Sequence, residues 1–300
     1  MADLDDLLKR TSRTFALAIP LLDEPTRREV SLAYLLFRIA DTFEDAARWP
    51  AGLRRTCLLE MAAVLEEGAA IATAPDELAR RWSALPDVHD ASCAELIAAT
   101  PEVLVALEAC GPRGAACVKK HVRRTALGMA DVVASCDADG NLAVPDVAAL
   151  KNYCYIVAGI VGEMLTELFV LDEPVLAGVA AKLDADAALF GEGLQLVNIL
   201  KDAGGDAVEG RRFLPPGVPL AELFAVARGD LTAASRYVRT LHEAGATRGT
   251  VAFTSLPVLL AYAALDAVES RGSGAKVPRE EVMRIVAKVD QALDAGASPL

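Results

Sequence analysis

The sequence lacks the marks of several common protein classes. Its six cysteines are scattered and form no C-x-x-C pair, which indicates reduced core thiols in a cytosolic protein and excludes a disulfide framework or a zinc site. Its three histidines show no metal-ligand spacing, and no G-x-G-x-x-G dinucleotide fingerprint is present. The acidic start, from Met1 to Asp6, has neither the basic nor the apolar region of a signal peptide.

The alternation of β-branched residues that is typical of strands is also scarce. Basic residues are fewer than acidic ones, 30 against 42. The chain of 300 residues is 53% hydrophobic, with Ala and Leu prominent, and this predicts an all-α protein. Its net charge of −12 argues against a nucleic-acid partner. Without a linker, fixed-period repeat or low-complexity segment, residues 1–300 are predicted to form one domain. The most apolar run, Val251 to Val268, is interrupted by polar residues and proline, which favours a core helix over a membrane span.

One stretch, from Tyr34 to Asp45, combines an apolar helix with a narrow polar stripe. Tyr34, Arg38, Asp41 and Asp45 stand at offsets 0, 4, 7 and 11, so they share one face of a helix. The other positions are mostly apolar, and a helix that is apolar on most sides is usually buried. Because buried carboxylates are costly unless paired, and Arg38 offsets only one charge, this first acidic seam indicates a bound cation.

A second stretch repeats the pattern. Gln195, Asn198, Asp202 and Asp206 stand at offsets 0, 3, 7 and 11, again on one helical face. Two buried helices with such seams can face each other across a cavity, where oxygen ligands suit magnesium and its shell is completed by water and substrate phosphate. The pair of seams therefore predicts a magnesium-dependent diphosphate site; the alternative for each seam is an ordinary solvated helix face.

Prolines and glycines divide the rest of the chain into predicted helices. Gly204 and Gly205 are expected to bend or end the second acidic helix, because each costs about 1 kcal/mol against Ala in a helix interior, and Asp206 would then lie on a looser turn. The turn at Asp137 to Asn141 lacks the final glutamate of a calcium loop, which excludes calcium. Helices are expected near 1–19, from 26 to the stop at Trp49-Pro50-Ala-Gly52, and near 52–67, 76–85, 91–109, 113–136, 146–170, from about 184, and near 220–228, 230–246, 250–270 and 279–295.

Three further segments have a chemical and a structural interpretation. Ser12-Arg-Thr-Phe15 could grip a phosphate, or could be a helix cap beside a surface arginine. The arginines between Glu209 and Pro216 could close over phosphate. The small residues Ala158, Gly159 and Gly162 allow close approach of a ligand tail or of another helix, as glycines in helices commonly do.

Taken in order, these motifs resemble the squalene/phytoene synthase family of head-to-head prenyl synthases. The resemblance covers nearly the whole chain and is nearest in style to squalene synthases. It is carried by Ser12-Arg-Thr-Phe15, Tyr34…Arg38…Asp41-Thr-Phe-Glu-Asp45, Gly128-Met-Ala-Asp131, Tyr153-Cys-Tyr-Ile-Val-Ala-Gly-Ile-Val-Gly162, Asn198-Ile-Leu-Lys-Asp202…Asp206, Gly210-Arg-Arg-Phe-Leu-Pro215 and Ser255-Leu-Pro257.

The resemblance implies a single-domain isoprenoid-synthase helical bundle around a central cavity, with roles for particular residues. Tyr153 would assist proton transfer, and Lys276 and Arg279 would stand in the basic segment associated with the NADPH step. Magnesium would be held by Asp41, Glu44, Asp45, Asn198, Asp202 and Asp206. The diphosphate substrate would be contacted by Ser12, Arg13, Phe15, Tyr34, Arg38, Gln195, Asn198 and Arg211.

The implied activity is magnesium-assisted condensation of two farnesyl diphosphates to presqualene diphosphate, followed by NADPH-dependent reduction to squalene. Alternatives within the family are a dehydrosqualene or phytoene synthase and a single-substrate terpene synthase; an alternative of another class is a catalytically silent binding or assembly partner. The chain ends at Leu300 without the carboxy-terminal anchor of eukaryotic squalene synthases, so a cytoplasmic enzyme with peripheral membrane contact is expected. Prenyl chain length, final product and oligomeric state do not follow from these residues.

Overall fold

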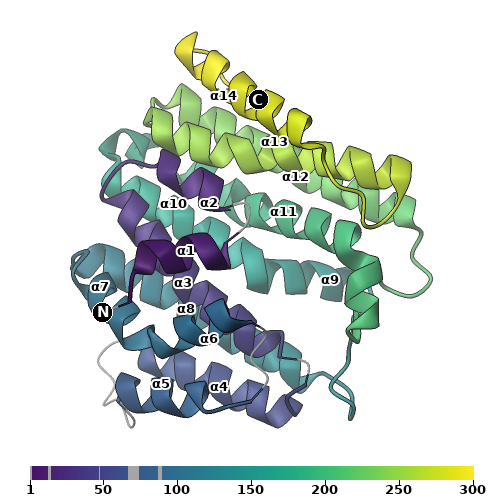
Figure 1. Cartoon of the computed structure of the whole chain (residues 1–300). Coiled ribbons are helices and arrows are strands. Elements are labelled where there is room, and N and C mark those ends of the chain that lie inside the picture. The colour runs from purple at the N-terminus through teal and green to yellow at the C-terminus, as the bar shows by residue number, and fades with distance from the viewer. Residues whose placement is uncertain (1, 13–14, 47, 67–73, 87–89) are drawn as a thin grey trace. The chain divides into compact units, whose positions relative to one another are not determined.

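The structure is a computed structural model that describes residues 2–12, 15–46, 48–66, 74–86 and 90–300. The chain divides into two compact units, the first of Met1–Ile19 with Glu24–Leu142 and the second of Pro20–Asp23 with Ala143–Leu300. Both units are built from helices, which confirms the prediction of an all-α protein (Figure 1). The single domain expected from the sequence stays a prediction.

The first unit is organised around one long helix, α3, which packs against α4, α6, α7 and α8. Its apolar positions are fully buried, with Leu32, Leu35 and Ile39 each at most 1% exposed. Local chemistry sets the helix starts: the Asp90 side chain caps α6 through the N–H of Cys93, at 2.8 Å. The helices are α1 (Leu4–Thr11), α2 (Phe15–Ala18), α3 (Thr26–Glu44), α4 (Ala51–Val64), α5 (Pro75–Ser83), α6 (Ala91–Ala98), α7 (Thr100–Glu108) and α8 (Pro112–Ala134).

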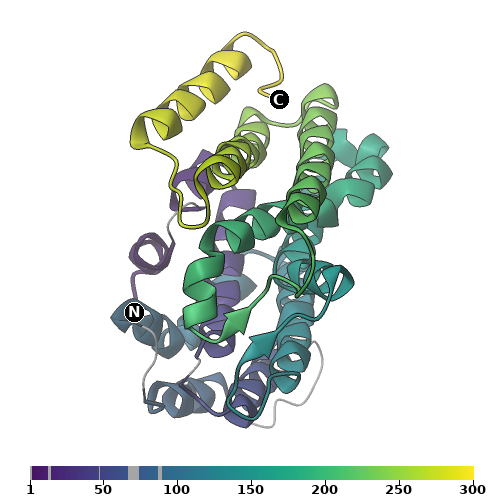
Figure 2. The same ribbon diagram turned by 90° about the vertical axis from the view of Figure 1, so that its right-hand side faces the viewer.

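The second unit is organised around α11, which packs against α10, α12 and α13. Figures 1 and 2 show α13 lying beside α12 and α14. The elements are α9 (Val147–Cys154), the π-helical turn η2 (Tyr155–Gly159), α10 (Ile160–Asp172), η3 (Pro174–Val179), α11 (Ala180–Val208), β2 (Arg211–Arg212), α12 (Leu220–Glu243), α13 (Arg248–Arg271) and α14 (Arg279–Asp294). Two short elements, η1 (Ile19–Leu21) and β1 (Leu142–Ala143), lie where the chain passes between the units.

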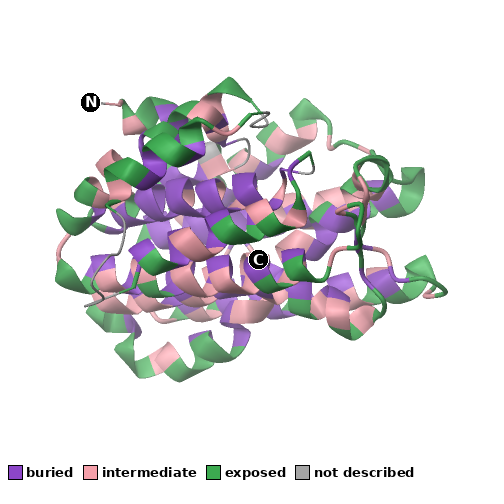
Figure 3. Cartoon of the chain, turned by 90° about the horizontal axis from the view of Figure 1, so that it is seen from below, coloured by how far each residue is buried: buried purple, intermediate pink, exposed green. Residues whose placement is uncertain are grey.

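Small residues let the helices of the second unit pack closely. A Cβ atom on Gly162 would lie 2.0 Å from the carbonyl oxygen of Ala187, and one on Gly191 would lie 1.9 Å from that of Ala158. Both glycines are therefore required by the approach of α11 to η2 and α10, which supports the helix-packing interpretation of Gly162. In Figure 3 the helices show both buried residues, in purple, and exposed residues, in green.

Several predicted helix boundaries are wrong. The helix expected at 1–19 is divided into α1, α2 and η1, and the helix expected at 91–109 is divided between α6 and α7. The helix expected at 146–170 is confirmed as one helical stretch, Val147–Asp172, with the π-helical turn η2 inside it, whereas the two helices expected near 220–228 and 230–246 are one helix, α12. The break between α6 and α7 falls beside Pro101, which lies in the first turn of α7.

Of the two outcomes expected at Gly204 and Gly205, a bend or an end of the second acidic helix, the end is wrong. The helix α11 continues to Val208, so Asp206 lies on a regular helical turn. The N–H of Gly204 donates a hydrogen bond to the hydroxyl of Ser273 at 3.1 Å. Contacts of this kind outweigh the intrinsic cost of two glycines.

Two helical stretches are long and apolar enough to cross a membrane when judged by length and composition alone. They are Val147–Asp172 and Arg248–Arg271, each with a mean hydropathy of 1.8. The most apolar window is 50% buried in the first and 67% buried in the second. A core helix passes the same test, and the burial of α13 favours the core-helix interpretation of Val251 to Val268.

Candidate active site

The first acidic seam lies on α3 as the sequence predicted. Asp41 and Asp45 are half-buried near the end of the helix, and the backbone N–H of Asp45 donates to the carbonyl oxygen of Asp41 at 2.7 Å. The side chain of Thr42, which is buried, donates back to the carbonyl oxygen of Arg38 at 2.7 Å. The Thr42 hydroxyl is therefore bonded within the helix, one residue from Asp41.

Electrostatics disfavours a charged Asp41 in the absence of a cation. The pKa of Asp41 is raised to about 7, chiefly by burial and also by the neighbouring charge of Asp45, while Arg38 acts in the opposite direction. A divalent cation would remove this penalty, because it attracts both carboxylates at once. The first seam therefore fits a metal ion better than it fits an empty helix face.

Arg38 offers a buried donor to a ligand. Its Nη2 atom donates to the Sγ atom of Cys93 at 3.7 Å, and that thiol lies 3.6 Å from the Oδ2 atom of Asp90. Within the described part of the chain, the Nε atom of Arg38 is buried and has no hydrogen-bond partner. Buried guanidinium donors are normally satisfied, so this N–H group points to an anionic ligand such as a phosphate.

Residues from the start of the chain surround Tyr34. The Tyr34 hydroxyl donates to the carbonyl oxygen of Thr11 at 3.1 Å, and the Phe15 and Tyr34 ring centroids are 6.0 Å apart. Burial raises the pKa of Tyr34, and a hydrogen bond with Ser12 lowers it. The structure thus brings Ser12, Phe15 and Tyr34 together as expected; Arg13 lies outside the described residues.

The second acidic seam lies on the last turns of α11 and is already paired with basic side chains. Lys201 donates to the Oδ1 atom of Asn198 at 3.3 Å and lies 3.3 Å from a carboxylate oxygen of Asp202. The Asp202 side chain is 56% exposed. Arg211 bonds the Oδ1 atom of Asp206 at 3.2 Å and Glu209 at 2.7 Å. Gln195, further back on the helix, is half-buried.

Tyr153 is buried on α9 against the loop that carries Arg211. Its ring centroid is 4.6 Å from that of Phe213, with an angle of 34° between the rings. Phe213 follows β2, and the N–H of Val144 donates to the carbonyl oxygen of Arg212 at 2.9 Å. The strand therefore connects the arginine loop to the segment leading into α9, beside Tyr153.

Three further predicted residues, Glu44, Lys276 and Arg279, have contacts of other kinds. Glu44 is buried on α3, its carbonyl oxygen accepts from Arg54, and its charge acts on the thiol of Cys136, whose pKa is raised chiefly by burial. Lys276 and Arg279 are exposed at the start of α14, and Arg271 donates to the carbonyl oxygen of Lys276 at 2.9 Å. Their assigned roles stay predictions.

A buried charge cluster in the second unit was not predicted from the sequence. Lys151 on α9 forms ion pairs with Glu192 on α11 and with Asp230 on α12, the latter at 2.8 Å. The Glu192 and Asp230 side chains are 8% and 10% exposed, and burial raises the pKa of both while Lys151 lowers it. Because the three residues come from separate helices, no fixed sequence spacing indicates that they are in contact.

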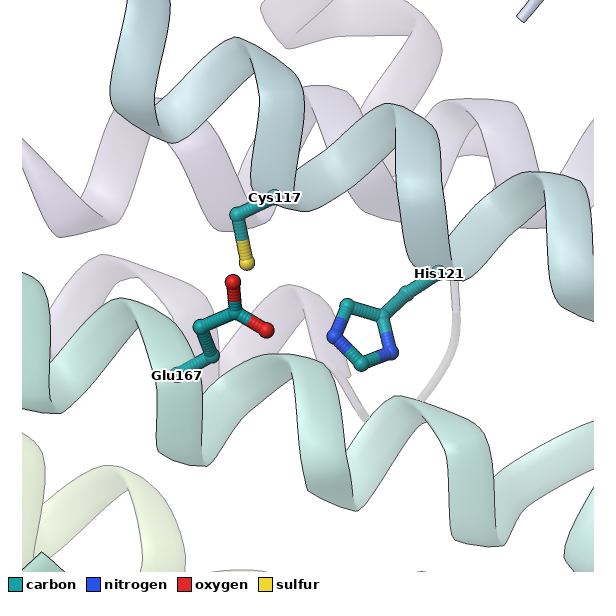
Figure 4. Close-up of side chains that lie close together, drawn as sticks. All are labelled: Cys117, His121 and Glu167. Atoms are coloured by element: carbon teal, nitrogen blue, oxygen red, sulfur yellow. The ribbon is translucent and has the colours of Figure 1, made fainter. Parts of the chain in front are cut away.

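Helix α8 carries two potential soft ligands, Cys117 and His121, one turn apart and both buried (Figure 4). The Nδ1 atom of His121 is 3.1 Å from an Nη atom of Arg124. Glu167, also drawn in Figure 4, belongs to α10 of the other unit. Structural metal sites take four protein ligands and catalytic ones three, so α8 does not make a metal site by itself.

Comparison with known proteins gives a consistent result. The family model described as squalene/phytoene synthase matches residues 8–218. Squalene synthase ERG9 of Saccharomyces cerevisiae is 30% identical over 216 residues, which are 70% of this chain and 44% of that protein. Botryococcus squalene synthase of Botryococcus braunii is 26% identical over 196 residues, which are 65% of this chain and 38% of that protein. The chain spans less than half the length of these curated relatives.

Solved structures show the same fold. TcSQS in a ligand complex superposes with a TM-score of 0.75 at 24% identity, covering 95% of this chain and 85% of that chain. A dehydrosqualene synthase in a ligand complex gives a TM-score of 0.62 at 20% identity, covering 97% of this chain and 95% of that chain. At these identities the likeness concerns the fold alone, and it confirms the prediction of an all-α isoprenoid-synthase fold.

Proposed function

Because the chain belongs to the squalene/phytoene synthase family, we propose that it is a prenyltransferase which condenses two farnesyl diphosphates head to head into presqualene diphosphate. The observation that carries the proposal is the first seam. It joins a carboxyl group whose pKa is raised to about 7, at Asp41, to a buried guanidinium N–H of Arg38 that has no acceptor among the described residues. Such a seam is suited to a metal ion and a diphosphate together.

The donor set fits magnesium. Asp41 and Asp45 on α3, and Asp202 and Asp206 with Asn198 on α11, offer oxygen ligands of the kind that magnesium prefers, and no soft ligand interrupts either seam. When bound, magnesium supplies the positive charge that neutralises the departing diphosphate. Glu44 is kept as a further ligand of the first group.

The other work falls to the chain's own side chains. Arg38 donates its Nε–H to a diphosphate oxygen, and Ser12 and Tyr34 lie beside it with hydroxyl groups that can do the same. Arg211 holds the Asp206 carboxylate and can exchange it for phosphate. The apolar faces of the helices exclude water from the allylic carbocation.

Tyr153 is assigned to the proton transfer that closes the cyclopropane ring. Its phenol is fixed by burial and by the Phe213 ring, so its oxygen is held in one place while the proton leaves the condensed carbocation. Reduction to squalene would draw a hydride from NADPH, with Lys276 and Arg279 as the cations available to its phosphates. We place the enzyme in the cytoplasm at the periphery of a membrane, since its product is insoluble in water.

Product analysis by gas chromatography with mass detection tests the proposal. Purified protein is incubated with farnesyl diphosphate and magnesium, with and without NADPH, and EDTA serves as the metal control. Squalene formed only with NADPH would establish both half-reactions, and presqualene diphosphate or dehydrosqualene regardless of NADPH would restrict the enzyme to the condensation. A fifteen-carbon product would indicate a single-substrate terpene synthase. No product from farnesyl or geranylgeranyl diphosphate, or turnover in EDTA, would overturn the proposal.

A further inference from the structure

The segment that joins α13 to α14 is hydrogen-bonded to the second acidic helix. The Ser273 hydroxyl donates to the carbonyl oxygen of Lys201 at 2.9 Å, and the N–H of Gly274 donates to the same oxygen at 2.7 Å. In return, the N–H of Gly204 donates to the Ser273 hydroxyl at 3.1 Å. One hydroxyl thus bridges an acceptor and a donor of a single turn of α11.

The Gly-Ser-Gly sequence of this segment is what presents the serine. Gly272 and Gly274 have φ angles of +86° and +84°, a region that other residues adopt only with strain. The approach is close, because a Cβ atom on Gly204 would lie 3.5 Å from the Ser273 hydroxyl oxygen. The two glycines and the serine between them therefore form a built contact, which we call the latch.

The turn that the latch holds is the one that carries the second carboxylate pair. Lys201 and Gly204 flank Asp202, and the side chain of Lys201 lies on Asn198 and Asp202. The turn is weak by itself, since Gly204 and the residue after it are poor helix formers and Asp202 is 56% exposed. The hydrogen bonds from Ser273 and Gly274 reach this turn from outside the helix, which continues to Val208.

We propose that Ser273 is a positioning residue for the second acidic seam: the latch fixes the turn from Lys201 to Gly204, so that Asp202 and Asp206 keep one spacing suited to a metal ion. The inference rests on the proposed function, because the latch can position metal ligands only if the second acidic seam binds a metal. Ser273 touches neither carboxylate and acts only through the helix backbone. Its effect is therefore expected on metal binding and on local order, with global stability almost unchanged.

Three variants separate this role from general packing. Ser273→Ala removes the bridging hydroxyl, and Ser273→Thr retains it. Ser270→Ala is the matched control, because the Ser270 hydroxyl bonds the carbonyl oxygen of Asp266 in its own helix, at 2.7 Å. Hydrogen exchange is followed in the metal-free proteins, and Mn²⁺ binding is measured by electron paramagnetic resonance without substrate.

For Ser273→Ala we expect faster exchange in peptides covering residues 198–206 and Mn²⁺ binding weakened by about tenfold, the low end for residues that orient metal ligands. Ser273→Thr and Ser270→Ala are expected to match the wild type in both measurements. Faster exchange that spreads equally to α12 would indicate a general structural role and overturn the inference.

A further variant distinguishes a failure of the proposed latch from a failure of the proposed metal site. Asp202→Asn is measured in parallel. If Asp202→Asn abolishes Mn²⁺ binding while Ser273→Ala binds as the wild type does, the latch is overturned and the metal site stands. If Asp202→Asn binds Mn²⁺ as tightly as the wild type, the metal assignment itself falls, and the role of the latch falls with it.

Discussion

The two acidic seams share a spacing but differ in their surroundings. On α3, the pKa of Asp41 is raised to about 7, chiefly by burial, and the Nε–H donor of Arg38 has no acceptor in the part of the chain that the structure describes. On α11, Asp202 is 56% exposed, and both it and Asp206 lie beside basic side chains. The same pattern of residues is therefore desolvated in one unit and neutralised by nearby cations in the other.

Both seams place carboxylates where the helix backbone disfavours them. Asp45 directly follows the last residue of α3, and Asp206 lies in the last turn of α11. The carboxyl end of a helix carries a partial negative charge and favours cations. The second seam meets this demand with ion pairs from Lys201 and Arg211, whereas on the first seam Arg38 lowers a pKa of Asp41 that burial has already raised. The difference indicates that the first seam depends more strongly on a bound metal.

The largest expected effect is the loss of turnover when either seam is broken. Asp41→Asn and Asp202→Asn should each lower turnover by about a thousandfold or more, because a metal ion contributes several kcal/mol to stabilising the leaving charge. Circular dichroism should show the helical fold intact. Asp184→Asn, an exposed position on the same helix as Asp202, is the control. Full activity in Asp41→Asn or Asp202→Asn would contradict the assignment of that seam.

A second prediction asks whether the second unit supplies more than metal ligands. Tyr153→Phe should slow formation of the cyclopropane by about a hundredfold, within the usual range for a general acid–base group, and change KM little. Single-turnover analysis of presqualene diphosphate would measure it. The control is Tyr155→Phe, which removes a hydroxyl that donates to Glu163 at 3.1 Å. Unchanged kinetics in Tyr153→Phe would make Tyr153 a packing residue and leave the unit with metal ligands alone.

The sequence could predict the seams because their information is local. A period of 3.6 residues places Asp41 and Asp45 on one face, and the apolar flanks predict burial of α3. Even so, the pattern predicted the same environment for Asp202, which is exposed. Burial depends on which helices pack against a face, and α11 carries its seam on its final turns. Such packing cannot be read from one segment.

The other contacts could not be predicted from the sequence, because the residues that form them are far apart along the chain. Nothing near Gly204 indicates that Ser273 holds its N–H, so an ending at the glycines was the natural inference. The ion pairs of Lys151 with Glu192 and Asp230 likewise join three helices. Long-range contacts of this kind override propensities of about 1 kcal/mol per residue.

A third prediction uses pH to separate the seams. Because Asp41 must lose its proton to bind a metal, and its pKa is raised to about 7, magnesium binding should strengthen about tenfold between pH 6 and pH 8. Isothermal titration calorimetry would measure it, and Asp41→Asn should abolish the dependence. The free energy of unfolding of the metal-free protein should instead fall as the pH rises. Unfolded Asp41 ionises near pH 4 and folded Asp41 near pH 7, so stability is lost as pH rises between them.

The smallest effect concerns the cation that the second seam already has. Lys201 lies 3.3 Å from the Asp202 carboxylate and from the Asn198 amide oxygen, where it occupies oxygen atoms that a metal would use. Exposed ion pairs are worth up to about 1 kcal/mol, so Lys201→Gln should strengthen Mn²⁺ binding by about two- to fivefold. Lys182→Gln, an exposed position earlier on α11, controls for the change in net charge.

The sign of the Lys201 effect decides what kind of pairing the second seam has. Tighter Mn²⁺ binding in Lys201→Gln, with Lys182→Gln unchanged, would mean that the lysine competes with the metal for Asn198 and Asp202 and is displaced when it binds. Weaker binding would mean that the lysine orients both ligands, which would contradict competition. In that case the second seam, like the first, would need a positioned basic side chain beside its carboxylates. The two seams would then differ only in the solvent exposure of those carboxylates.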